Sequence, residues 1–171
     1  MGLKILNATE DDLSGIVEVI NSHIKNDFNG ILEDQLVTRE SKKIWFEQFK
    51  SIGPYRLFVA KLNDQIVGYT CSFRYRENKA FDKTIETSIY THAKNNERGV
   101  GSALYTKLSE SIKKEKLHTV VVGIALPNEG SVNIHKKFGF EEIGIFKDYI
   151  FQNGTYTSSL WMKKLLHKSI S

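Results

Sequence analysis

The chain has 171 residues, 40% hydrophobic and 26% charged, with a formal net charge of +4 and a single cysteine, Cys71. This globular composition predicts one domain over residues 1–171, and a lone cysteine excludes an intrachain disulfide and favours a reducing compartment. Without a signal-peptide pattern, a long apolar run or a concentrated basic patch, we expect a cytoplasmic protein that binds neither membrane nor nucleic acid.

The first part of the chain is predicted to form a short strand and two helices. The strand covers about residues 3–7, and Thr9 and Asp12 then form a capping box before apolar residues at helical spacing that continue to Ile24. A second helix is predicted over residues 38–51. Its apolar residues are expected on one face: Ile44, Trp45 and Phe49.

The middle of the chain is rich in β-strand signals. Strands are predicted over residues 56–62, 65–76 and 84–92, the first two joined by a turn at Asn63-Asp64. They indicate an antiparallel meander. Cys71 falls within the second strand, which favours a structural, half-buried thiol over a nucleophile.

The last part alternates helices and strands. A helix begins at Gly99, and a strand over residues 119–125 lacks polar alternation, which predicts burial on both faces. A short helix over residues 131–137 precedes two strands joined by a hairpin turn at Asn153-Gly154. The order β-α-α-β-β-β-α-β-α-β-β defines an α/β (α+β) chain of seven strands and four helices.

A glycine-rich strand-to-helix junction carries the strongest chemical signal. Gly99 and Gly101 stand where the strand ending near residue 92 leads into the next helix. Free backbone amides and the positive end of the helix dipole at such a junction suit a pyrophosphate. A Gly-x-Gly alone is more readily explained by a tight strand-to-helix turn, and neither the dinucleotide fingerprint nor the triphosphate loop is present.

The junction resembles the acetyl-CoA loop of the GNAT superfamily, Gln/Arg-x-x-Gly-x-Gly/Ala, with Asn in place of Gln or Arg. A second stretch, residues 128–140, is similar to the family's Asn-x-x-Ala/Ser-x-x-x-Tyr-x-Lys-x-Gly-Phe. The resemblance implies the GNAT fold, a mixed sheet of about seven strands flanked by four helices, with acetyl-CoA as cosubstrate. It implies these cofactor-binding residues: Ile89, Tyr90, Thr91, Asn96, Glu97, Arg98, Gly99, Val100, Gly101, Ser102, Asn128 and Ser131. Helix capping is a second role for Asn128, and both can hold.

Within the superfamily, the chain most resembles the phosphinothricin acetyltransferase branch, through residues 80–90, 99–105 and 126–140. The branch implies Glu86 as general base for the amine and His135 as donor to the departing CoA sulfur. It also implies that Arg76 and Phe28 bind a small amino-acid-like acceptor, such as phosphinothricin, methionine sulfoximine or methionine sulfone, and that the protein forms a homodimer. We expect direct transfer in a ternary complex, with a backbone N–H of Ile89 or Tyr90 facing the oxyanion.

Structural explanations exist for both catalytic candidates: Glu86 as a solvent-facing strand residue and His135 as a structural histidine. The histidines show no ligand spacing, so no metal is expected. Two other functions stay open. One is acetylation of a protein N-terminus or lysine, and the other is a CoA-binding module without turnover.

Overall fold

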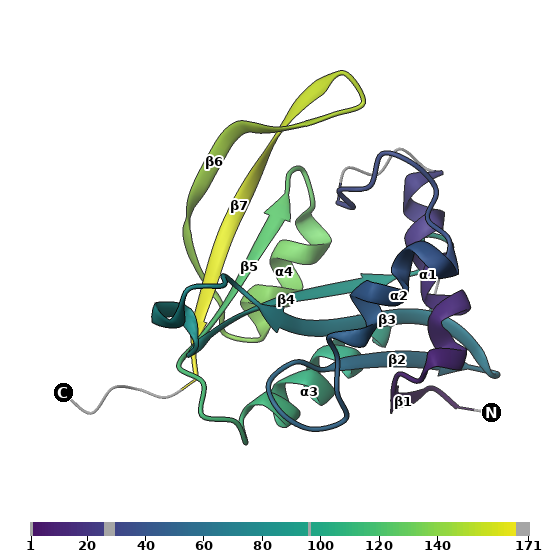
Figure 1. The fold of residues 1–171 in the computed structure, drawn as a ribbon. Helices are drawn as coiled ribbons and strands as arrows, with labels where there is room; N and C mark the ends of the chain where they lie inside the picture. Colours follow the sequence, from purple (N-terminus) through teal and green to yellow (C-terminus); the bar gives the residue numbers. More distant parts are fainter. Residues whose placement is uncertain (1, 26–29, 96, 167–171) are drawn as a thin grey trace.

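The computed structural model describes residues 2–25, 30–95 and 97–166 (Figure 1). Its strands are β1 (Lys4–Asn7), β2 (Leu57–Leu62), β3 (Gln65–Arg74), β4 (Thr84–Thr91), β5 (Thr119–Ala125), β6 (Glu141–Gln152) and β7 (Thr155–Leu165). Its α-helices are α1 (Leu13–Ile24), α2 (Arg39–Glu47), α3 (Val100–Ile112) and α4 (Glu129–Lys137). The order of these elements is the predicted one.

The strands form one mixed sheet in the order β1-β2-β3-β4-β5-β7-β6. Every neighbouring pair is antiparallel except β4 and β5, which are parallel and are connected through α3. This parallel pairing covers only three residues of each strand and ends at Glu86 and Val121, although both strands continue. Figure 1 shows the two strands diverging from that point.

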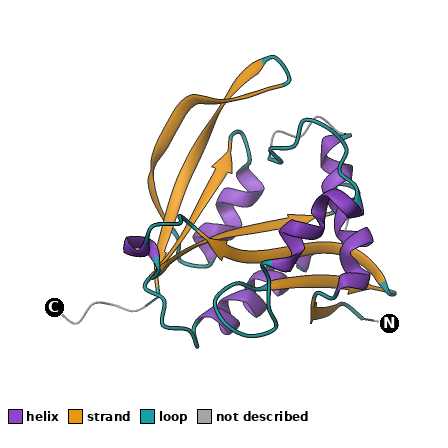
Figure 2. Ribbon diagram, viewed as in Figure 1, coloured by secondary structure: helices purple, strands orange, loops and turns teal. Residues whose placement is uncertain are grey.

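Helices cover both faces of the sheet (Figure 2). Alternate residues of β2 face opposite ways, so that Phe58 and Ala60 pack in one cluster with α3 while Leu57 and Val59 pack in another with α1. The amphipathic patterns of α1 and α3 therefore place their apolar stripes against opposite sides of the same strands.

Helix α2 differs from its predicted length and face. It ends at Glu47 instead of residue 51, and Phe49, just beyond it, is buried while its amide donates to the Phe46 carbonyl. Ile44 is 82% exposed, because it lies about 100° round the helix from Trp45, which packs against the core. The prediction that Ile44 shares the packed face is wrong.

Two further expectations of burial are corrected. Gly123 of β5 is exposed on the face that opens beside β4, so the strand is not covered on both sides throughout. Cys71 is fully buried instead of half-buried, and burial raises the pKa of its thiol to about 12. A thiol that stays protonated at neutral pH is a poor nucleophile, which agrees with the structural role predicted for Cys71.

The hairpin between β6 and β7 turns at Asn153 and Gly154, both with positive φ, as the sequence predicts. Within the described ranges, no helix is long and apolar enough to cross a membrane. The same residues contain no group of three or more His, Cys, Asp or Glu side chains arranged to hold a metal ion.

Candidate active site

Two adjoining cavities lie where β4 and β5 separate. The first, of about 280 Å³, contains Glu86 and is called here the Glu86 cavity. The second, of about 400 Å³, reaches the start of α3 and is called the α3 cavity. They meet at a shared wall formed by Gly30, Ser88, Tyr90, Gly123 and Ala125.

The separation of the strands leaves backbone groups of β4 without a strand partner. Arg56 and Ser72 exchange two backbone hydrogen bonds between β2 and β3, which fixes the alternation of bonding directions along β3. Successive residues of a strand direct their backbone N–H and C=O groups to opposite sides. In the register of β3 with β4, the amide of Tyr90 therefore points toward β3, and the amide of Ile89 points toward the gap beside β5. Of the two amides expected to face an oxyanion, the one at Ile89 therefore faces the gap.

The start of α3 has the features of an anion site. Gly99 caps the helix in the left-handed region, with φ of 88°, which a side chain would strain. The first intrahelical bond runs from Ala103 N–H to the Gly99 carbonyl at 2.9 Å, so the preceding amides of the first turn have no partner inside the helix. The first turn carries no acidic residue.

A basic side chain lies beside these amides. Lys137, at the end of α4, donates from Nζ to Ser102 Oγ at 3.1 Å. Its charge adds to the positive end of the α3 dipole, so the junction suits a phosphate group. Sequence reasoning missed Lys137 as a site residue, although its place in the second motif was a usable signal.

Most of the predicted cofactor residues lie together in the α3 cavity. Nine of them line it: Ile89, Tyr90, Thr91, Glu97, Gly99, Val100, Gly101, Asn128 and Ser131. Arg98 and Ser102 do not line it, although both lie at the start of α3. Asn96 falls outside the described residues.

Asn128 performs the capping role that its sequence suggested. Its Oδ1 accepts from the Ser131 amide at 3.1 Å, and α4 begins at Glu129, two residues earlier than predicted. Because the side chain also lines the α3 cavity, capping leaves its amide NH₂ available to a ligand.

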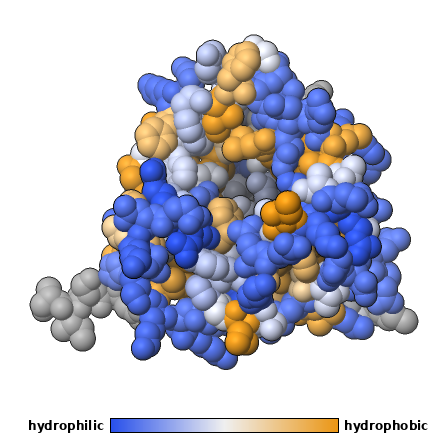
Figure 3. Space-filling model, in the orientation of Figure 1, coloured by the Kyte–Doolittle hydropathy of each residue, from blue (hydrophilic) through white to orange (hydrophobic). Residues whose placement is uncertain are grey.

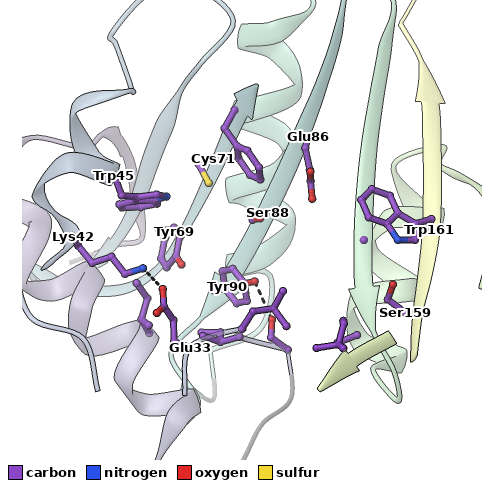
Figure 4. Close-up of a pocket in the computed structure, with 18 of the residues that line it drawn as sticks. Glu33, Lys42, Trp45, Tyr69, Cys71, Glu86, Ser88, Tyr90, Ser159 and Trp161 are labelled. Atoms are coloured by element: carbon purple, nitrogen blue, oxygen red, sulfur yellow. Dashed lines mark hydrogen bonds and ion pairs between the residues drawn. The ribbon is translucent and has the colours of Figure 1, made fainter. Parts of the chain in front are cut away.

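Glu86 lies at the last residue pair before the strands part, opposite Val121. Its half-buried carboxyl group points into the Glu86 cavity, with Trp161 of β7 on the opposite wall (Figure 4). Desolvation by burial raises the pKa of Glu86 to about 7. Such a carboxylate can accept a proton at neutral pH, and it is not the solvent-facing strand residue of the structural alternative.

His135 lines the α3 cavity and is 1% exposed. Its Nδ1 lies 2.7 Å from the Ser131 carbonyl oxygen, which can only accept, so Nδ1 carries the proton of the neutral ring. Burial lowers the pKa of His135, and its Nε2 has no hydrogen-bond partner within the described chain. The neutral ring therefore offers a lone pair, and no proton, at Nε2, which does not favour the donor role expected for His135.

Of the two residues expected to bind an acceptor, only Arg76 can be located, and it lies outside the Glu86 cavity. Arg76 is exposed and lines neither cavity; its guanidinium lies over the rings of Tyr75 and Phe81, at 5.1 and 5.6 Å from their centroids. Phe28 falls outside the described residues.

The walls of the Glu86 cavity come mainly from residues that sequence reasoning did not select. They include aromatic side chains of α2, β3 and the β6–β7 hairpin, in addition to the predicted Tyr90: Trp45, Tyr69, Phe73, Tyr149 and Trp161. Glu33 and Lys42 form an ion pair in the same wall (Figure 4). Their contact depends on tertiary packing, and no local pattern indicated it.

Comparison with known proteins agrees with this geometry. Residues 5–161 match the family model described as "Acetyltransferase (GNAT) domain". The chain is 30% identical over 166 residues to phosphinothricin N-acetyltransferase of Streptomyces coelicolor, covering 96% of both chains. Ribosomal-protein-alanine N-acetyltransferase of Brucella melitensis has a similar structure, with a TM-score of 0.88 and 29% identity, covering 95% of this chain and 99% of that one. An acetyltransferase structure from Salmonella typhimurium with acetyl-CoA has a TM-score of 0.90 at 23% identity, covering 100% and 98%.

Proposed function

Because the chain belongs to the GNAT acetyltransferase family, we propose that it transfers the acetyl group of acetyl-CoA to the primary amine of a small, amino-acid-like acceptor. The observation that carries this proposal is the junction of the two cavities at the break between β4 and β5, with Glu86 on one side and the start of α3 on the other.

The residues of the α3 cavity fit acetyl-CoA. The first-turn amides of α3, which have no partner inside the helix, suit the pyrophosphate together with Lys137 beside them. The free edge of β4 offers backbone groups to the amides of the pantetheine arm, in the way that a strand would pair. Following this edge from α3 toward Glu86 brings the thioester end to the wall shared by the two cavities.

Glu86 acts as the base in this scheme. The bound ammonium gives a proton to the Glu86 carboxylate, and the neutral nitrogen attacks the thioester carbon directly in a ternary complex. The negative charge that develops on the carbonyl oxygen faces the amide of Ile89. The tetrahedral centre then loses the thiolate, the nitrogen passes its second proton to the departing sulfur through water in the cavity, and Glu86 afterwards releases its proton to solvent.

His135 holds the cosubstrate's surroundings in place without acting as an acid. Its ring packs edge-on against Tyr105 and Phe140, with centroids 5.1 and 5.2 Å away, and its N–H is bound within α4. The unpartnered Nε2 is then available to accept a hydrogen bond from an N–H or O–H of the bound cosubstrate.

The likeness to a ribosomal-protein-alanine N-acetyltransferase makes a protein N-terminus the second candidate acceptor. A small acceptor is favoured because the Glu86 cavity is partly closed on one side. Gln152, at the end of β6, donates from its amide to the carbonyls of Ile31 and Glu33, at 3.0 and 3.1 Å. These bonds connect the hairpin to the segment after α1 and leave less room for a polypeptide.

The deciding experiment is to incubate the purified protein with acetyl-CoA and a panel of amino acids, their analogues and alanine-initiated peptides. Release of free thiol and the mass of the acetylated product are recorded together. Turnover with the small amines supports the proposal. Turnover with peptides alone would establish the second candidate, and acetyl-CoA binding without thiol release on any amine would indicate a module without catalysis.

The hairpin also supports a homodimer. Edge strand β6 exposes several apolar side chains: Ile143, Ile145, Phe146, Tyr149 and Phe151. Figure 3 shows hydrophobic surface in its upper part, where Figure 1 places the hairpin. A long edge strand with such a surface is usually covered by a partner.

Replacing Ile145, which is 53% exposed, by lysine is therefore expected to convert a dimer into a monomer, because a charge would be buried at the interface. Molar mass from light scattering coupled to size exclusion measures this. The Ile44→Lys variant, changed at an 82% exposed residue on α2, is the control that should stay dimeric. A wild-type mass of one chain at micromolar concentration would contradict the proposal.

A further inference from the structure

Trp161 of β7 forms the wall of the Glu86 cavity across from Glu86, and it takes no part in the proton transfer proposed above (Figure 4). Because β7 lies between β5 and β6, Trp161 has two cross-strand partners, and both are glycines: Gly123 on β5 and Gly144 on β6. The indole ring can therefore lie over either neighbouring strand without meeting a side chain of its paired residue. The strand that it covers decides which part of the cavity it borders.

The ring covers Gly123. A Cβ at Gly123 would lie 3.0, 3.1 and 3.4 Å from Cζ2, Cε2 and Cη2 of Trp161, whereas a Cβ at Gly144 would meet no atom within 4 Å. The indole thus occupies the space that a side chain of residue 123 would fill. Gly123 belongs to the wall shared by the two cavities, while Trp161 lines the Glu86 cavity and not the α3 cavity. The ring therefore borders the Glu86 side of the junction.

Aromatic neighbours hold the ring in this position. Its centroid lies 6.2 Å from that of Tyr75 and 6.3 Å from that of Phe146, and both contacts are edge-to-face, an arrangement that aromatic pairs prefer. Trp161 is half-buried among these groups. The indole is consequently a fixed part of the cavity wall and does not need to be placed when ligands bind.

The thioester of the cosubstrate is expected to direct its acyl chain toward this wall. A thioester carbon is planar, with its oxygen, its sulfur and its acyl chain spaced evenly around it. In the proposed scheme the oxygen faces the Ile89 amide on β4, and the sulfur comes from the α3 cavity. The acyl chain is then directed away from both, across the gap toward β5, where Trp161 covers Gly123.

The length of the acyl chain matters at this place. An acetyl group ends there in one methyl. A propionyl group has a further carbon, which would either meet the indole or take volume that the amine needs in a cavity of about 280 Å³.

We propose that Trp161 is a specificity-determining residue for the acyl donor: its indole, lying over Gly123, closes the acyl end of the junction and limits the transferred group to acetyl. This inference rests on the proposed N-acetyltransferase function and specifies its donor.

The preference between two donors at one fixed acceptor tests this role. In the wild-type protein, kcat/KM measured by thiol release is expected to be about tenfold or more lower with propionyl-CoA than with acetyl-CoA, the scale on which one methylene is discriminated. In Trp161→Leu, the propionyl-to-acetyl ratio is expected to rise by about tenfold, because the ring over Gly123 is gone. Trp45→Leu changes the other tryptophan of the cavity, on α2, and should leave the ratio unchanged. Using one acceptor cancels effects on acceptor binding.

The two glycines beside Trp161 provide a matched pair of variants. Gly123→Ala places a methyl group against the indole, which crowds the acyl end of the junction and is expected to lower kcat/KM for acetyl-CoA by about tenfold. Gly144→Ala adds the same methyl group on the other side of Trp161, where it meets no atom, and should leave kcat/KM unchanged.

Tryptophan fluorescence tests the contact without turnover, in the absence of any amine. The chain has two tryptophans, so Trp45→Phe leaves Trp161 as the only one. Acetyl-CoA is expected to change the emission of this variant, whereas free CoA, which lacks the acyl group, should leave it near that of the unliganded protein. In Trp161→Phe, the emission should be the same with acetyl-CoA and with CoA.

The outcomes are distinguishable. Equal kcat/KM with the two donors in the wild type, an unchanged ratio in Trp161→Leu, or identical Trp161 emission with CoA and acetyl-CoA would each overturn the role of Trp161. Free CoA should bind Trp161→Leu with unchanged affinity, since Trp161 does not line the α3 cavity, and calorimetric titration thereby shows that the variant is folded. Absence of thiol release from acetyl-CoA with every amine of the panel would instead overturn the proposed enzymatic function.

Discussion

Replacement of Glu86 by glutamine is expected to lower kcat by about 10²- to 10⁴-fold, the range that a positioned general base contributes. Glutamine keeps the shape of the side chain but cannot accept the proton of the ammonium. Because Glu86 lines the Glu86 cavity and not the α3 cavity, the affinity for acetyl-CoA should be unchanged. Stopped-time thiol assays and calorimetric titration with acetyl-CoA measure the two quantities separately.

The pH profile gives an independent readout of the same role. Burial raises the pKa of Glu86 to about 7, and the carboxylate is the form that accepts a proton, so wild-type kcat should rise as pH increases through about 7 and level off above it. The glutamine variant should lose this inflection. Glu110→Gln, on the exposed side of α3, is the control. A variant of Glu86 with undiminished kcat and the same inflection would remove Glu86 from the base role.

The second large effect is expected from Gly101→Val, which should weaken acetyl-CoA binding by roughly tenfold or more, because the start of α3 has no space for a branched side chain. A Cβ at residue 101 would lie 3.1 Å from Ile134 Cδ1 and 3.7 Å from Ile89 Cδ1. The valine crowds these two side chains, and any shift of the helix start that relieves the crowding moves its first-turn amides as well.

Direct titration with acetyl-CoA checks this prediction, and circular dichroism confirms that the variant is folded. Gly144→Val on β6 is the matched control, because a Cβ there would meet no atom within 4 Å. If Gly101→Val bound acetyl-CoA as tightly as the wild type, the phosphate site would have to lie elsewhere.

The order of the elements and the position of the cofactor junction could be predicted because both depend on local signals. The capping pair at Thr9 and Asp12, the glycines before α3 and the Asn153-Gly154 turn each specify backbone geometry within a few residues. Such local signals do not depend on distant contacts, and therefore the predicted order of helices and strands agrees with the observed order.

The charged wall of the Glu86 cavity could not be predicted in the same way. Lys42 and Glu33 are nine residues apart, and Gln152 contacts Glu33 across 119 residues. For Arg76 the resemblance suggested an acceptor contact, whereas its guanidinium lies over two neighbouring rings and does not line the cavity. The tautomer of His135 could not be predicted either, since it depends on which carbonyl lies beside Nδ1.

The gap between β4 and β5 affects the stability of the protein when no ligand is bound. A sheet interrupted at its centre has backbone groups of β4, such as the amide of Ile89, without a strand partner beyond Glu86, and a ligand lying along this edge extends the ladder. Binding to the folded form alone stabilises it, by about 2.7 kcal/mol when the ligand is at 100 times its dissociation constant. The melting temperature should therefore follow the supply of acetyl-CoA, so that a cell depleted of this metabolite holds a more easily unfolded enzyme.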